Sequence, residues 1–173
     1  MPNATAPTNR PHWLRVLAFG RRPKATLVRI LVLGVSCFVV FRFCLVPIRI
    51  DGISMLPTYR TGQINFINRL AYLRHEPRRG DPVSIRLAGP SVMFMKRIIG
   101  LPGETVSFQN GRACINGHPL DEPYIKLPCD WNREPVQCGP GQFYVVGDNR
   151  SMAFEHHTQG RAERARIIGK LLL

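Results

Sequence analysis

Ser54 and Lys96 are two residues of this chain whose types could together break an amide bond. A serine hydroxyl is a poor nucleophile until a base within hydrogen-bond reach takes its proton. A lysine amine can be that base when it is neutral, and burial favours the neutral form by disfavouring the charge. If Lys96 lies in a strand, Phe94 and Ile98 share its face and supply apolar surroundings. The pair therefore predicts a serine nucleophile with a lysine general base.

Both residues stand in longer runs of distinctive sequence. Ser54 lies within DGISMLPT (residues 51–58), Lys96 lies within FMKRIIGLPGE (94–104), and a third run, GDNR, occupies 147–150. In this order the runs resemble those of type I signal peptidases, the membrane-bound Ser/Lys peptidases of family S26 that remove signal peptides. The resemblance covers nearly all of the chain after residue 47. It implies an antiparallel β catalytic domain in a short form of the family.

The resemblance also implies roles for the residues around the dyad. The backbone N–H of Ser54 would donate to the oxyanion, and Gly52 stands where some relatives carry a second, serine donor. Substrate would bind in an extended conformation against five residues: Gly52, Ile53, Ser54, Met55 and Phe94. Small residues are expected at substrate positions −1 and −3. No cofactor and no metal are expected.

Strand alternation assigns a supporting role to Arg97. If Lys96 points to one face of a strand, Arg97 points to the other, where an acid is needed to pair with it. Asp148 of the third run is the natural candidate. Arg97 and Asp148 are therefore predicted to support the site.

The segment after Arg150 departs from the resemblance. Relatives commonly continue with Ser-x-Asp-Ser-Arg, and an alignment without gaps puts Ala153 at the first serine and Glu155 at the aspartate. Ala153 lacks the hydroxyl that helps to orient the lysine in relatives, and Ser151 or Thr158 could replace it. Glu155 is predicted to keep the supporting carboxylate.

His156 and His157 follow at the second serine and the arginine. Adjacent residues of a strand face opposite ways, and no cysteine or carboxylate set accompanies the two histidines at zinc-site spacing. They are predicted to be surface histidines, with a possible effect on the pH dependence of activity.

The net charge of +13 by itself indicates an anionic partner, either nucleic acid or a membrane surface. Seven basic residues and no acidic residue precede Pro47, which leaves +6 for the rest. Residues 27–46 are apolar apart from Arg29 and Arg42 near the two ends, and about 20 residues span a bilayer as a helix. A cleaved signal peptide or a buried core helix are the alternatives. We favour a retained transmembrane helix at 25–46.

The positive leader predicts the orientation, because positive residues stay cytoplasmic. Residues 1–24 are then a cytoplasmic basic tail, disordered over the proline-rich 2–11, and residues 47–173 are a periplasmic or otherwise extracytoplasmic peptidase domain. The expected location is the bacterial inner membrane, crossed once. The expected partners are the lipid bilayer and secreted preproteins, not nucleic acid, and the sequence predicts no oligomeric state.

Short runs separated by turn residues predict the strands of the exterior domain: 63–67, 82–87, 92–99, 105–108, 113–115 and 142–146. Asn110-Gly111 and Asn116-Gly117 are typical hairpin turns. The predicted fold class is mainly β, an antiparallel barrel or sandwich preceded by one transmembrane helix. Residues 161–170 fit a helix, and Ile167-Ile168 fit a last strand equally well.

Two of the five cysteines, Cys129 and Cys138, are possible disulfide partners in an oxidising compartment. Cys114 is then left over, and Cys37 and Cys44 lie in the apolar segment.

The predicted function is a membrane-anchored serine endopeptidase that removes signal peptides. The alternatives are a conjugative-pilus maturation peptidase of the same superfamily and a low-activity or inactive homologue that only binds precursors. A self-cleaving repressor is disfavoured, because the membrane segment occupies the place of its DNA-binding domain.

Overall fold

The apolar segment near the N-terminus is helical. The structure, a computed structural model, describes residues 23–88, 92–127 and 129–172. Helix α2 (Pro23–Val39) continues into a π-helical turn, Val40–Cys44. The stretch Lys24–Cys44 has a mean hydropathy of 2.2 and is long and apolar enough to cross a membrane. The chain divides into two units, residues 1–41 and 42–173, and most of the predicted basic tail lies outside the described residues.

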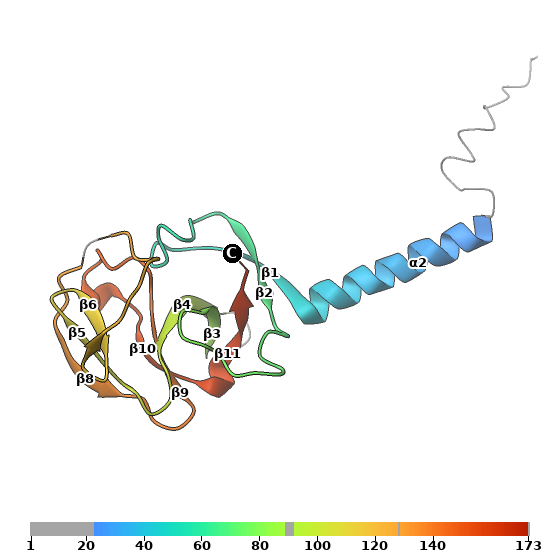
Figure 1. Cartoon of the computed structure of the whole chain (residues 1–173). Helices are drawn as coiled ribbons and strands as arrows, with labels where there is room; N and C mark the ends of the chain where they lie inside the picture. The colour runs from blue at the N-terminus through green and yellow to red at the C-terminus, as the bar shows by residue number, and fades with distance from the viewer. Residues whose placement is uncertain (1–22, 89–91, 128, 173) are drawn as a thin grey trace, which may run out of the picture. The chain divides into compact units, whose positions relative to one another are not determined.

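The second unit is built from two antiparallel sheets (Figure 1). The larger sheet has seven strands in the order β1-β2-β11-β3-β4-β9-β10, and the smaller has four in the order β7-β6-β5-β8. The larger sheet contains β1 (Leu45–Arg49), β2 (Ile64–Asn68), β3 (Pro82–Ala88), β4 (Val92–Gly100), β9 (Gln142–Val146), β10 (Gly160–Glu163) and β11 (Ile167–Leu171). The smaller sheet contains β5 (Thr105–Gln109), β6 (Arg112–Ile115), β7 (His118–Pro119) and β8 (Arg133–Gln137). The predicted mainly β, antiparallel fold is confirmed.

The larger sheet packs different cores on its two faces. Val83, Ile98 and Val145 belong to one cluster of buried side chains. Met95 packs instead against a second cluster that includes Ile50 and Met55. Because neighbouring residues of β4 face opposite ways, the strand separates the two clusters.

A third cluster, rich in aromatic rings, joins the two sheets. Phe108 of β5 and Trp131 meet edge to face at 5.4 Å between ring centroids. Trp131 also meets Phe154, which lies in the 3-10 turn Phe154–His156, at 5.1 Å. This cluster therefore anchors the loop after β9 to the smaller sheet.

The predicted hairpin turns are confirmed, and one of two alternatives for the C-terminal segment is wrong. Asn110-Gly111 and Asn116-Gly117 have positive φ angles, as turns of this type require. Residues 161–170 do not form an α-helix. They form the end of β10, a 3-10 turn at Arg164–Arg166 and most of β11, because β11 completes the sheet between β2 and β3.

The predicted disulfide between Cys129 and Cys138 is not formed in the structure, where both are free thiols. The Cys129 sulfur accepts a hydrogen bond from the Trp131 N–H at 3.5 Å. The Cys138 sulfur instead lies against Gly100 of β4, 3.5 Å from where a Cβ on that glycine would lie. The two thiols are therefore engaged with different neighbours.

Candidate active site

Strand β4 carries Lys96 into the interior. Lys96 pairs with Val83 of β3 and is only 3% exposed. Its neighbours on the same face of β4, Phe94 and Ile98, are apolar, as predicted from the alternation. The amine has no hydrogen-bond partner among the residues that the structure describes.

The segment with Ser54 forms a turn between β1 and β2 that is bound to the loop after β9. The Asn149 N–H donates to the Ser54 carbonyl oxygen at 3.0 Å, and the Asn149 side-chain amide donates to the Ile53 carbonyl at 3.1 Å. Met55, next in the chain, is 2% exposed and packs among Ile50 and Tyr59. The backbone on either side of the Ser54 hydroxyl is therefore held in place.

Asp148 connects all three sequence runs. Its two carboxylate oxygens accept hydrogen bonds from Arg97 Nε at 2.8 Å and Arg97 Nη2 at 2.5 Å, so the predicted pair is present and bidentate. Thr58 Oγ1 also donates to Asp148, at 2.6 Å. Asp148 is fully buried and Arg97 is 4% exposed. One carboxylate therefore binds the Lys96 strand and the Ser54 turn together.

Gly147 marks the point where the serine turn and the lysine strand meet. Val146 pairs with Arg97 at the end of β9, and extending this antiparallel register by one residue places Gly147 beside Lys96. A Cβ on Gly147 would lie 2.2 Å from the Ser54 carbonyl oxygen and 2.8 Å from Cε1 of His157. The bare Cα therefore leaves room for the Ser54 carbonyl and the His157 ring to lie together at Gly147. No hydrogen bond joins the Ser54 hydroxyl to the Lys96 amine within the described part of the chain.

The surroundings of Lys96 favour its neutral form. Burial lowers the pKa of Lys96 to about 8, and the negative charge of Asp148 opposes this shift. Burial also acts to lower the pKa of Arg97, but the hydrogen bonds and the charge of Asp148 outweigh it and raise that pKa. Asp148 therefore keeps Arg97 charged while Lys96 can release its proton near neutral pH.

The backbone at the Ser54 turn offers a free donor. In the described residues the Ser54 N–H has no hydrogen-bond acceptor. Gly52 has a φ of +105°, a conformation that L side chains rarely adopt. A serine at that position would therefore strain this turn, and the Ser54 N–H is the donor that remains for an oxyanion.

Two small pockets adjoin Ser54 and Lys96, the residues of the predicted dyad. A pocket of about 260 Å³ contains Gly52, Ser54, Met55 and Phe94 in its wall, and one of about 150 Å³ contains Phe94 and Lys96. Phe94 thus lines both pockets.

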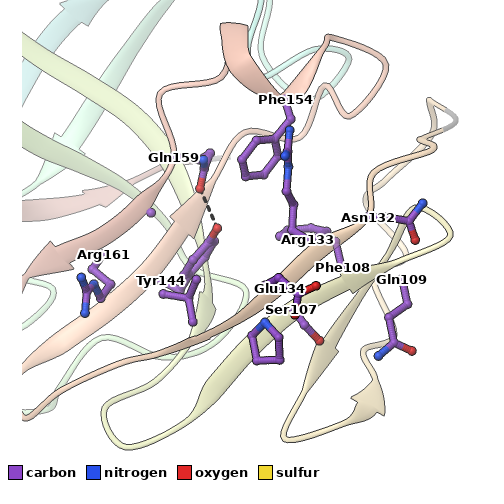
Figure 2. A pocket seen from close by; sticks show the side chains of 13 residues that line it. Ser107, Phe108, Gln109, Asn132, Arg133, Glu134, Tyr144, Phe154, Gln159 and Arg161 are labelled. Atoms are coloured by element: carbon purple, nitrogen blue, oxygen red, sulfur yellow. Dashed lines mark hydrogen bonds between the residues drawn. The ribbon is translucent and has the colours of Figure 1, made fainter.

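Figure 2 shows a wider groove of about 890 Å³, lined by residues of β5, β8, β9 and β10, in which Tyr144 donates to Gln159 at 2.6 Å. Neither Ser54 nor Lys96 lines this groove. The larger space is therefore separate from the predicted chemistry.

The structure does not bring Glu155 to the dyad. Glu155 is exposed and pairs with Arg133 of β8, so its predicted supporting role near Lys96 is not seen. Ala153 is also exposed, as are Ser151 and Thr158. Glu155 lies in the short 3-10 turn Phe154–His156.

The prediction of two surface histidines is right for His156 and wrong for His157. His156 is exposed, whereas His157 is 5% exposed and its ring lies 4.9 Å from that of Trp131. His157 follows directly on the 3-10 turn Phe154–His156, and its ring packs edge to face against Trp131.

Sequence reasoning missed a second buried ion pair, between Arg150 and Glu122. Arg150 is 1% exposed and donates to both Glu122 oxygens, at 2.6 and 3.2 Å, and to the Gly147 carbonyl at 2.8 Å. The GDNR run pointed to Arg150, but no local signal marked Glu122, which is 28 residues away. Groups of three or more potential metal ligands are absent from the described ranges.

Comparisons with known proteins agree on one family. The model of the family "Signal peptidase, peptidase S26" matches residues 24–173. Signal peptidase I of Leptolyngbya laminosa is 37% identical over 153 residues, which are 83% of this chain and 72% of that protein. Signal peptidase I of Bacillus licheniformis is 31% identical over 153 residues, 81% of each chain.

A crystal structure of a signal peptidase I from Enterococcus faecalis V583 aligns with 56% of this chain and 97% of that chain. The identity is 27% and the TM-score is 0.45, so the family assignment rests on the sequence matches.

Burial of the Lys96 amine is expected to lower the free energy of unfolding of this chain at neutral pH. A lysine with a pKa of about 8 in the fold and about 10.4 when unfolded destabilises the fold by about 3 kcal/mol below that window. Stability from this group rises with pH between the two values, because only the unfolded chain then holds the proton. Lys96→Met should therefore raise the free energy of unfolding at pH 7, and the gain should shrink towards pH 10.5.

Denaturant unfolding of the full chain in detergent micelles at the two pH values measures this effect. Lys126→Met, at an exposed lysine, is the matched control and should leave the free energy of unfolding unchanged. Equal stability of Lys96→Met and wild type at pH 7 would contradict the assignment.

Proposed function

This chain belongs to the signal peptidase family, peptidase S26, whose members are serine endopeptidases that remove signal peptides, and we propose that it does so with Ser54 as nucleophile and Lys96 as general base. The observation that carries the proposal is the meeting of three distant sequence runs at one point. Asp148 binds both Arg97 and Thr58, and Asn149 binds the backbone of Ser54.

The proposed chemistry follows from the lysine's surroundings. Neutral Lys96 takes the proton of the Ser54 hydroxyl as the oxygen attacks the carbonyl carbon of the scissile bond. The Ser54 N–H donates to the oxyanion of the tetrahedral intermediate. The lysine ammonium then gives its proton to the leaving amine, and an acyl-enzyme remains. Lys96 then takes a proton from water as the water attacks the ester carbonyl, and the lysine ammonium gives that proton to the departing Ser54 oxygen, which restores both residues.

We propose that the signal peptide binds in an extended conformation between the Gly52 turn and the Phe94 end of β4. The pocket of about 260 Å³ at Ser54 is lined by both segments. Phe94 also walls the pocket at Lys96, so its ring limits the space on both sides. This arrangement supports a preference for small substrate residues at −1 and −3.

Loss of either dyad residue should abolish cleavage. Ser54→Ala removes the nucleophile and Lys96→Ala the base, so each should lower kcat by about 10⁴-fold or more. In the wild type, kcat/KM should rise with pH and level off above about 8, because only neutral Lys96 accepts the proton.

Cleavage of a peptide whose signal ends in Ala-x-Ala, by the full chain in micelles, measures both effects. Lys126→Ala is the matched control for Lys96→Ala. Full activity in Ser54→Ala or Lys96→Ala would disprove the dyad. A wild type that binds the peptide without turnover would identify an inactive homologue instead.

Phe94 should set the size limit at the cleavage site. In Phe94→Ala the shared wall is removed, so kcat/KM for a peptide with Leu at −1, relative to the Ala peptide, should rise about tenfold. Leu73→Ala, at a side chain that is 72% exposed and outside both pockets, is the control. An unchanged Leu-to-Ala ratio in Phe94→Ala would place the specificity elsewhere.

We also propose that the chain is anchored once in a bacterial inner membrane, with residues 1–24 in the cytoplasm and residues 47–173 outside. The apolar helix and the seven basic residues before Pro47 support this orientation. Attraction of these basic residues to anionic lipids would add to the anchoring.

Protease treatment of spheroplasts that express the chain tests the orientation. An N-terminal epitope tag should stay intact while the exterior domain is digested, because only that domain is accessible. Inverted membrane vesicles should give the opposite pattern. Digestion of the tag in intact spheroplasts would reverse the proposed topology.

A further inference from the structure

His157 is a buried side chain whose two ring nitrogens differ in their hydrogen bonding. Its Nε2 lies 2.6 Å from the carbonyl oxygen of Asn149, and its ring packs against Trp131. Its Nδ1 is a buried atom without a hydrogen-bond partner in the described part of the molecule. Buried polar atoms nearly always have a partner, so this nitrogen calls for an explanation.

The hydrogen bond to Asn149 fixes the state of the ring. A carbonyl oxygen can only accept, so Nε2 carries the proton and donates it. In the neutral ring Nδ1 then holds a lone pair and is an acceptor. Nδ1 of His157 is therefore a buried acceptor that lacks a donor in the described part of the molecule.

The Lys96 amine is a donor near this ring, because its charge acts on the pKa of His157. Cε1, the ring atom between Nδ1 and Nε2, lies 2.8 Å from the Cβ position of Gly147, and extending the Arg97–Val146 register by one residue places Gly147 beside Lys96. Neither the Lys96 amine nor Nδ1 of His157 has another partner in the described residues. The same Cβ position lies 2.2 Å from the Ser54 carbonyl oxygen, so the Ser54 turn and the His157 ring meet at Gly147.

We propose that His157 is the positioning residue for Lys96: its Nδ1 accepts a hydrogen bond from the lysine amine and directs the amine towards the Ser54 hydroxyl. This inference rests on the proposed function of Lys96. It assigns to His157 the orienting task that exposed Ala153 does not perform.

The charges around His157 keep it in the accepting form. Burial lowers its pKa, the positive charges of Lys96 and Arg150 lower it further, and only the hydrogen bond to Asn149 opposes the shift. Asp148 is the acid whose negative charge acts on Lys96 and raises its pKa. The ring is therefore neutral at pH 7, and Nδ1 stays available to the amine.

Two substitutions test the roles of the two ring nitrogens of His157 separately. His157→Gln keeps an N–H near the position of Nε2, for the bond to Asn149, and removes the acceptor at Nδ1. His157→Asn places an amide oxygen near the position of Nδ1 and loses the bond to Asn149. His156→Gln, at the adjacent exposed histidine, is the matched control.

His157→Gln should unfold at the wild-type temperature, lower kcat about 10- to 100-fold with little change in KM, and move the acidic limb of the kcat profile to lower pH. The acidic limb moves because a hydrogen bond to Nδ1 of His157 stabilises the Lys96 ammonium. Loss of this bond therefore lowers the pKa of Lys96. His157→Asn should recover part of kcat at the cost of thermal stability, and His156→Gln should match the wild type. An unchanged kcat and an unmoved limb in His157→Gln would overturn the proposal.

A spectroscopic measurement tests the contact in the wild type itself, independently of cleavage. In the ¹⁵N NMR spectrum of the full chain in micelles, His157 should be the Nε2–H tautomer, with an Nδ1 resonance that shifts in Lys96→Met. A proton on Nδ1, or an Nδ1 resonance that is the same in Lys96→Met, would overturn the proposal even if a variant failed to fold. Failure of the wild type to cleave would count against the proposed function alone.

Discussion

The buried ion pair between Arg97 and Asp148 is the interaction on which the arrangement of the site depends. Removing two charges from water is unfavourable unless the pair is well formed and its remaining hydrogen-bonding groups are satisfied. Here Asp148 also accepts from Thr58, while Arg97 donates to the Gly80 carbonyl at 2.7 Å and lies 4.0 Å over the ring of Tyr124. These added contacts join three further segments of the chain to the pair.

The same pair determines where Lys96 points. Because Arg97 is held on one face of β4, strand alternation places Lys96 on the other face, among apolar residues. The fold thereby buries one cation with its counter-charge and a second without one. Arg97 stays charged, whereas burial lowers the pKa of Lys96 and favours its neutral form. One strand therefore supplies both a structural cation and the proposed base.

A second ion pair and an aromatic cluster hold the opposite side of the site. Arg150 binds Glu122 and the Gly147 carbonyl, and its guanidinium lies 5.8 Å from the ring centroid of Trp131. Trp131 in turn contacts His157 and Phe154. The smaller sheet, which carries none of the proposed catalytic residues, thus determines the position of the loop that reaches Lys96.

The sequence by itself determined six of the strands (β2, β3, β4, β5, β6 and β9), the hairpin turns, the apolar helix and the residue types of the proposed dyad, because these depend on local periodicity, turn chemistry and short motifs. It also predicted the Arg97–Asp148 pair, since alternation in one strand and a single acid in a nearby motif sufficed. Only the tertiary structure decided that Glu155 faces Arg133, that Cys129 and Cys138 stay apart, and that His157 is buried. These depend on how a 3-10 turn and the two sheets pack, and such contacts between residues far apart in the chain leave no local pattern.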